Sequence, residues 1–131
     1  GKNSRGYIVT KSISINGKAI NRIDIKIFSD SENSKVISKC DSLIEGNGIV
    51  ESIPRIEIYN KKNYYNHEAK TEKIDDQKVF YLQSLGIDKK KAKKLIYTGF
   101  ADDILKNFPP SYQIRIKKLL EIELEEIGGF G

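Results

Sequence analysis

The pattern of apolar residues changes once along this chain, near residues 63–69, and this change limits the folds that the chain can adopt. Before it, apolar and polar residues mostly alternate, as in half-buried strands, and turn residues recur at short intervals. After it, apolar residues recur every three or four positions, which is typical of amphipathic helices. The sequence therefore predicts a mainly β portion over residues 1–72 and a helical portion over residues 73–131.

The β portion contains four predicted strands and a short fifth one. Their predicted ranges are residues 7–14, 19–28, 35–44, 49–59 and 64–67. Within the second range, Ile23, Ile25 and Ile27 share one face and charged residues occupy the other, which indicates a half-buried strand. Pro54 breaks the fourth run, because proline has no N–H for a sheet, and we expect it at a strand start, a bend or an edge. A sandwich, a barrel and a solenoid all fit this spacing.

Three helices are predicted in the second portion, with capping residues at their ends. Asp75 and Asp88 are N-cap candidates, because an Asp side chain accepts hydrogen bonds from the free amides of a first turn. Gly86 is suited to end the first helix and Gly128-Gly129 the last, and Pro109-Pro110 separates the second helix from the third. The predicted apolar faces consist of Val79, Phe80, Leu82 and Leu85, then Ala92, Leu95, Ile96, Gly99, Phe100 and Ile104, then Tyr112, Ile116, Leu119, Leu120, Leu124 and Ile127.

The composition is that of a globular chain, with 38% hydrophobic and 31% charged residues. No apolar run approaches the roughly 20 residues that cross a bilayer, so no membrane span is predicted. A single cysteine cannot form an internal disulfide, which fits a reducing compartment such as the cytoplasm. Because the sequence contains no methionine, we expect the natural protein to extend further on its N-terminal side.

A net charge of +5 and the lysines at 89–91, 93 and 94 allow a different interpretation, a basic nucleic-acid-binding module. The excess charge is modest and spread along the chain, which favours a solvated lysine-rich surface. Strongly salt-dependent binding would identify a nucleic-acid partner.

Cys40, His67 and Glu68 are the candidate metal and cofactor ligands. Phosphate-binding loops, paired cysteines, the HExxH motif and GxSxG elbows are absent from the sequence. Thiolate is the soft ligand that iron–sulfur clusters favour, imidazole is borderline and carboxylate is hard. Such a mixed set suits a cluster that is built and handed on. Adjacent strand residues point to opposite faces, so His67 and Glu68 would both face Cys40 only at a bulge or bend.

Other interpretations of these residues remain open. A Cys40–His67 pair could serve an enzyme as thiolate and imidazole. A lone cysteine in a strand is commonly a small buried hydrophobe, and the chain could be a strand-rich interaction domain without metal chemistry. The predicted strand at residues 35–44 places Ser38, Cys40 and Ser42 on one small, mixed face. Three ligands cannot complete a cluster, so a partner or the N-terminal region would have to supply more.

A series of short motifs runs through the chain in a specific order. They are Lys39-Cys40-Asp41-Ser42-Leu43-Ile44, Pro54-Arg55-Ile56-Glu57-Ile58, His67-Glu68-Ala69 and Phe80-Tyr81-Leu82-Gln83-Ser84-Leu85-Gly86. This series resembles the C-terminal portion of the SufB/SufD family, scaffold components of the SUF iron–sulfur cluster assembly system. The likeness runs from about Ser4 to Glu126. The cysteine before Asp41 and the His-Glu pair favour the SufB side of the family.

The resemblance implies the C-terminal turns of a right-handed parallel β-helix over residues 1–72, followed by a small helical domain over residues 73–131. It implies that Cys40 takes part in cluster assembly, with His67 and Glu68 close to it. A transient iron–sulfur cluster would be shared there with a second SufB/SufD-type scaffold chain. Residues near 80–100 would dock the ABC-type ATPase SufC. The chain would not itself be an enzyme, and would act in the cytoplasm or in an organelle such as a plastid.

Overall fold

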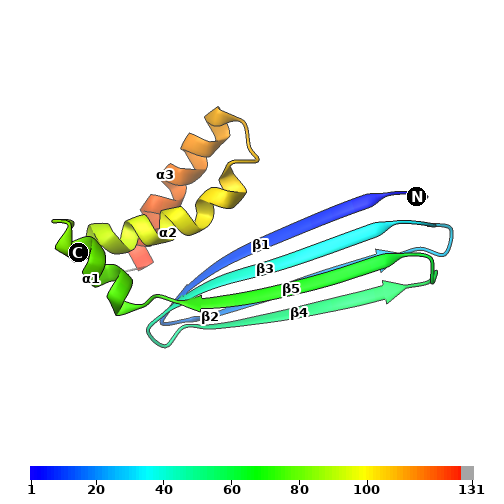
Figure 1. Cartoon of the computed structure of the whole chain (residues 1–131), viewed down its shortest axis with the longest axis horizontal. Helices are drawn as coiled ribbons and strands as arrows, with labels where there is room; N and C mark the ends of the chain where they lie inside the picture. The colour runs from blue at the N-terminus through cyan, green and yellow to red at the C-terminus, as the bar shows by residue number, and fades with distance from the viewer. Residues whose placement is uncertain (128–131) are drawn as a thin grey trace.

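The computed structural model describes residues 1–127 as five strands followed by three helices (Figure 1). The strands are β1 (Arg5–Ile15), β2 (Lys18–Ile27), β3 (Lys35–Glu45), β4 (Ile49–Ile58) and β5 (Tyr64–Lys73). The helices are α1 (Asp76–Ser84), α2 (Lys89–Leu105) and α3 (Pro110–Ile127). The predicted order of a mainly β portion and a helical portion is therefore confirmed.

The strands form two parallel sheets that lie one over the other in Figure 1. One sheet has the order β1-β3-β5, and the other consists of β2 and β4. The chain alternates between the two sheets, so β1, β2 and β3 each pair with the strand two places later in the sequence. The β1–β3 and β3–β5 registers run without a break, which places Cys40 between Thr10 and Ala69.

One core lies between the two sheets. Ile23, Ile25 and Ile27 of β2 are buried there and pack with Cys40 of β3. Val36 and Tyr65 cover the same cluster from its side. The predicted alternation of the second strand is confirmed, because the residues between these isoleucines are exposed. Burial of these apolar side chains holds the sheets together and fixes which face of β3 points inward.

A second core joins the strands to the helices. Leu43 of β3, Tyr97 of α2 and Leu124 of α3 are buried together, and Ile13 and Ile74 pack against them. Leu43 lies next to Ser42 in the strand and therefore points to the opposite face of its sheet. The helices thus cover the outer face of the three-stranded sheet, at the end where β1 and β3 finish.

Two strands differ from their predicted bounds. β5 runs from Tyr64 to Lys73 rather than ending at residue 67, because it stays in register with β3 as far as Ile44. β4 continues through Pro54 rather than breaking there. β4 pairs only with β2, so Pro54 lies in an edge strand, where a residue without an N–H is tolerated. The edge position expected for Pro54 is therefore confirmed.

The predicted helix ends agree with the structure. Asp75 accepts a hydrogen bond from the amide of Gln77 at 2.9 Å, and Asp88 accepts one from the amide of Lys91 at 3.0 Å. Gly86, with φ +86°, follows α1 in the left-handed region that favours glycine. Gly128-Gly129 and the side chain of Ile127 lie outside the described residues.

The predicted apolar faces of the helices are only partly buried. Val79 is buried in α1, but Phe80 is 73% exposed and Leu85 is exposed as well. Leu95, Tyr112 and Leu119 of the later helices are also exposed. Conversely, Tyr97 and Leu105 are buried although they lie outside the predicted faces. Periodicity identifies an apolar side of a helix but not the element that covers it, so the predicted faces did not determine which of these side chains are buried.

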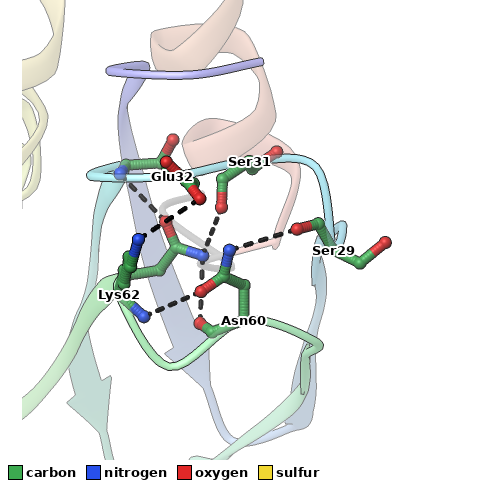
Figure 2. A network of polar contacts seen from close by, with 7 residues as sticks. Ser29, Ser31, Glu32, Asn60 and Lys62 are labelled. Carbon is green, nitrogen blue, oxygen red and sulfur yellow. Dashed lines mark hydrogen bonds and ion pairs between the residues drawn. The ribbon is translucent and has the colours of Figure 1, made fainter.

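A network of polar side chains fixes the turns at one end of the sheets (Figure 2). Asn63 donates from Nδ2 to the carbonyls of Ser31 and Asn60 at 2.9 and 3.1 Å, and its Oδ1 accepts from the amide of Ser34 at 2.9 Å. Asn60 donates to the carbonyl of Ser29 at 3.1 Å. These bonds tie the turn before β3 to the turn before β5, and so help to set the register that aligns the two strands.

Replacing Asn63 with alanine should therefore lower the free energy of unfolding by about 2 kcal/mol, because three partly buried hydrogen bonds are lost. Urea unfolding followed by circular dichroism measures this loss. Asn47→Ala is the matched control at the other end of the sheets, where an exposed side chain is removed, and it should change stability by less than about 0.5 kcal/mol. Equal losses for the two variants would contradict the assignment.

Candidate functional site

Cys40 lies on the inner face of β3, directed at the core between the two sheets. It is 1% exposed, and Ser38 and Ser42, its neighbours on the same face, are 0% and 2% exposed. The small, mixed face predicted for this strand is therefore confirmed. Three small side chains in a row permit β2 to approach closely, and isoleucines fill the space opposite. The thiol therefore faces the isoleucines of β2, and the hydroxyl groups of Ser38 and Ser42 flank it along its own strand.

His67 shares this inner face. In the β3–β5 register His67 lies opposite Ser38, and Cys40 lies opposite Ala69. Ser38 Oγ is 2.7 Å from His67 Nδ1 and 2.9 Å from the hydroxyl of Tyr65, within hydrogen-bonding distance of both. The imidazole is half-buried, on the strand next to the one that carries the thiol. The fold therefore brings Cys40 and His67 to one face of adjacent strands.

Glu68 points to the opposite face. It lies opposite Lys39, and Lys39 Nζ is 3.0 Å from Glu68 Oε2. Asn66 donates to Glu68 Oε1 at 3.2 Å. The hydrogen bond to Glu68 and the attraction of its charge raise the pKa of Lys39 above its ordinary value. The β3–β5 register contains no bulge, so the condition under which Glu68 would join the other two residues is not met in this chain.

The two inner donors do not form a complete metal site. Within residues 1–127, no three His, Cys, Asp or Glu side chains are grouped so that they could hold a metal ion. Cys40 and His67 supply one sulfur and one nitrogen, and Glu68 is turned away on the outer face.

The inner face opens toward solvent beside β5. This strand is the last in its sheet, and its inward residues Ala69 and Thr71 are exposed. In the other sheet, Ile56 and Ile58 of β4 are also exposed, although they pair with buried isoleucines of β2. Among the described residues, no strand pairs with the far edge of β4 or β5. The thiol of Cys40 on β3 therefore lies one strand from the open edge of its own sheet, which is formed by β5. It packs against β2, which pairs with β4, the strand at the open edge of the other sheet.

The helices carry exposed apolar side chains of their own. Phe80, Tyr81 and Leu85 of the α1 region and Leu95 of α2 are exposed, and α1 packs against α2.

The positive charge of the lysine-rich part of α2 is partly neutralised by ion pairs. Lys93 forms an ion pair with Glu45, and Lys94 forms ion pairs with Glu121 and Glu125 at 3.4 and 3.1 Å. Lys89, Lys90 and Lys91 point into solvent.

Sequence reasoning placed Ser38 on the face of Cys40 but gave it no role, and it did not single out Tyr65. Both residues lie at the imidazole only because β3 and β5 pair in parallel with Ser38 opposite His67. A sequence signal that fixed this register would have identified them.

None of the helices within residues 1–127 is long and apolar enough to cross a lipid bilayer.

Comparison with known proteins gives a consistent result. The family described as "SUF system FeS cluster assembly, SufBD core domain" matches residues 1–100. The chain is 37% identical over 128 residues to an iron–sulfur cluster assembly SufBD family protein of Galdieria sulphuraria. It is 34% identical over 125 residues to a protein with the same family description from Staphylococcus aureus strain USA300. These matches cover 95% and 94% of the chain, but they span only 58% of the first relative and 27% of the second.

Proposed function

Because the chain belongs to the SufBD family of SUF-system iron–sulfur cluster assembly proteins, we propose that it is the C-terminal part of a SufB-like scaffold that holds and passes on a nascent cluster. The observation that carries the proposal is the placement of Cys40 and His67 on one inner face of adjacent strands, beside an open sheet edge. The cluster is the cargo of this site. Cys40 is its thiolate ligand or the carrier of its sulfur, and His67 is a second ligand or a proton partner.

Glu68 takes an outer role in this proposal. It lies on the same strand as His67 but faces away from the thiol and is paired with Lys39. From there it can serve as a ligand or proton partner only at the strand edge, once the bond to Lys39 is released. Hard carboxylate oxygen and borderline imidazole bind iron more weakly than four thiolates, which suits a cluster that is transferred.

We propose that the strand portion is the last part of a right-handed parallel β-helix. Alternation of the chain between two parallel sheets supports this, since each strand stacks on the strand two places earlier in the sequence. We place the boundary between this portion, residues 1–72, and a C-terminal helical domain, residues 73–131, at the end of β5, whose last residue is Lys73.

A second SufB/SufD-type scaffold chain is the proposed partner at the open edges of β4 and β5. The unpaired edges and the exposed inward residues of both strands support this, because a partner there would cover them. The partner, identical or paralogous, would also supply the ligands that this chain lacks.

Anaerobic reconstitution tests this function. The protein and its full set of partners are incubated with ferrous iron and sulfide, and cluster formation is followed by visible absorbance. A cluster should form with the complete set, and it should be lost on mild acid or chelator treatment more readily than a cluster held by four cysteines. Failure of the complete set to form any cluster would count against the scaffold function and favour an interaction domain without metal chemistry.

The helices are the proposed docking site of a SufC-like ABC ATPase, which would hydrolyse ATP as a separate chain, either in the cytoplasm or in a plastid. The exposed apolar side chains Phe80, Tyr81 and Leu85 support this surface, because exposed apolar groups close together commonly mark an interface. The lysine run next to them would then border a protein interface. Lack of binding to a DNA duplex at low salt would distinguish it from a nucleic-acid site.

Replacing Phe80 with serine should weaken binding of the ATPase about 10-fold or more, since a central aromatic anchor is removed from the interface. Isothermal titration calorimetry measures the affinity. Ile114→Ser on α3 is the matched control, because Ile114 is 71% exposed and Phe80 is 73% exposed, so neither change should affect folding. If the Ile114 variant lost affinity and the Phe80 variant kept it, the docking surface would lie on α3 instead.

A further inference from the structure

Ser38 lies within hydrogen-bonding distance of the imidazole of His67. We propose that Ser38 is a positioning residue that accepts a hydrogen bond from Nδ1–H of His67 and so leaves Nε2 as the nitrogen that can bind iron. This inference rests on the proposed function, because it concerns how His67 is prepared as a ligand. In this proposal Ser38 acts through His67 and does not itself contact the cluster.

The geometry leaves Ser38 few hydrogen-bond partners. Its side chain is 0% exposed, and its Oγ lies 2.7 Å from His67 Nδ1 and 2.9 Å from the hydroxyl of Tyr65. A serine hydroxyl has one hydrogen to donate and two lone pairs that can accept. Since water does not reach this hydroxyl, its hydrogen goes to one of these two neighbours. The three groups therefore form a short chain of hydrogen bonds that can run in only two directions.

The two directions have opposite consequences for metal binding. A neutral imidazole carries one N–H. If Tyr65 donates to Ser38 and Ser38 donates to Nδ1, the ring proton is on Nε2 and that nitrogen has no lone pair for iron. If Nδ1–H donates to Ser38, the serine donates to Tyr65 and Nε2 keeps its lone pair. Ligating histidines almost always donate their other N–H to a protein acceptor, so the second direction is the one that a ligand requires.

The parallel register makes this arrangement specific to Ser38. Ser38 lies opposite His67, whereas Ser42, at the same distance from Cys40 in the other direction, lies opposite Thr71. Both serines are buried on the same face of β3. Ser42 is therefore a matched control: replacing it removes a buried serine hydroxyl from the same face of β3 without touching the imidazole.

The test uses the fact that His67 is the only histidine of the chain. In the chain prepared without a histidine tag and labelled with ¹⁵N-histidine, two-bond ¹H–¹⁵N correlation spectra of the neutral ring show which nitrogen carries the proton. We expect the Nδ1–H form in the wild type. Ser38→Ala should shift the ring to the Nε2–H form, and Ser38→Thr, which retains the hydroxyl, should restore Nδ1–H. Ser42→Ala should match the wild type.

Assembly provides the second readout, with circular dichroism as the check on folding. Ser38→Ala should lower the rate of cluster formation with the full partner set about 10-fold or more, while Ser42→Ala leaves it unchanged. An Nε2–H ring in the wild type, or a ring unaffected by Ser38→Ala, would overturn the proposal. The tautomer is measured without a cluster. If the tautomer behaves as expected but the wild-type protein forms no cluster with its full partner set, the scaffold function fails and the role of Ser38 in orienting the ring stands.

Discussion

Replacing Cys40 with alanine should abolish cluster assembly and leave the fold intact. The change removes the only sulfur of the chain, and with it the soft ligand on which the proposed site depends. It deletes one heavy atom from a cluster of isoleucines and should lower the free energy of unfolding by only about 1 kcal/mol. Anaerobic reconstitution with the full partner set measures assembly, and circular dichroism measures the fold.

Val36→Ala is the control for this experiment. Val36 packs against the same core and lies on the same strand, so its truncation also loosens the packing but removes no ligand. The Val36 variant should assemble clusters while the Cys40 variant does not. If the Cys40→Ala protein supported full cluster formation, the role given to Cys40 would be wrong.

Among the substitutions proposed for this protein, Gly48→Ala should destabilise the fold most. It should lower the free energy of unfolding by about 3 kcal/mol or more. A Cβ atom at this position would lie 2.4 Å from the carbonyl oxygen of Ser14 and 3.1 Å from that of Glu45. Both are backbone atoms that cannot move without shifting β1 or β3. The amide of Gly48 also donates to the carbonyl of Glu45 at 3.0 Å, so the turn between β3 and β4 would be distorted.

Gly17→Ala provides the comparison. A Cβ there would meet only the carbonyl of Ile15, at 3.7 Å, which is an ordinary contact. Its effect on the midpoint of urea unfolding should be small. The Gly48 variant should show a much lower midpoint, and a Gly48 variant as stable as the Gly17 variant would show that the turn can relax around the added methyl group.

Local patterns in the sequence predicted most of the elements. Alternation identified β2 because Ile23, Ile25 and Ile27 each face the same core. Asp75 and Asp88 could be identified as caps because the hydrogen bond of a cap is made within a few residues of the side chain. In each case the energetic cause lies close in sequence to the residue that shows it, so one stretch of sequence is enough.

The site could be predicted only in part, because its pairing is not local. Strand parity showed that His67 and Glu68 would face opposite ways, and they do. The contact between Ser38 and His67 depends on the register of two strands separated by a complete passage through the other sheet. Burial of Tyr97 depends in the same way on where α2 meets β3 and α3. Such contacts are set by packing, which one sequence does not display.

The free borders of β4 and β5 also bear on how the protein behaves without a partner. A row of unused N–H and C=O groups is a template on which any extended peptide can add itself. Exposed Ile56 and Ile58 make that addition more favourable on one of the two borders. The chain purified without a protein that covers these borders should therefore form larger self-associated species as its concentration rises.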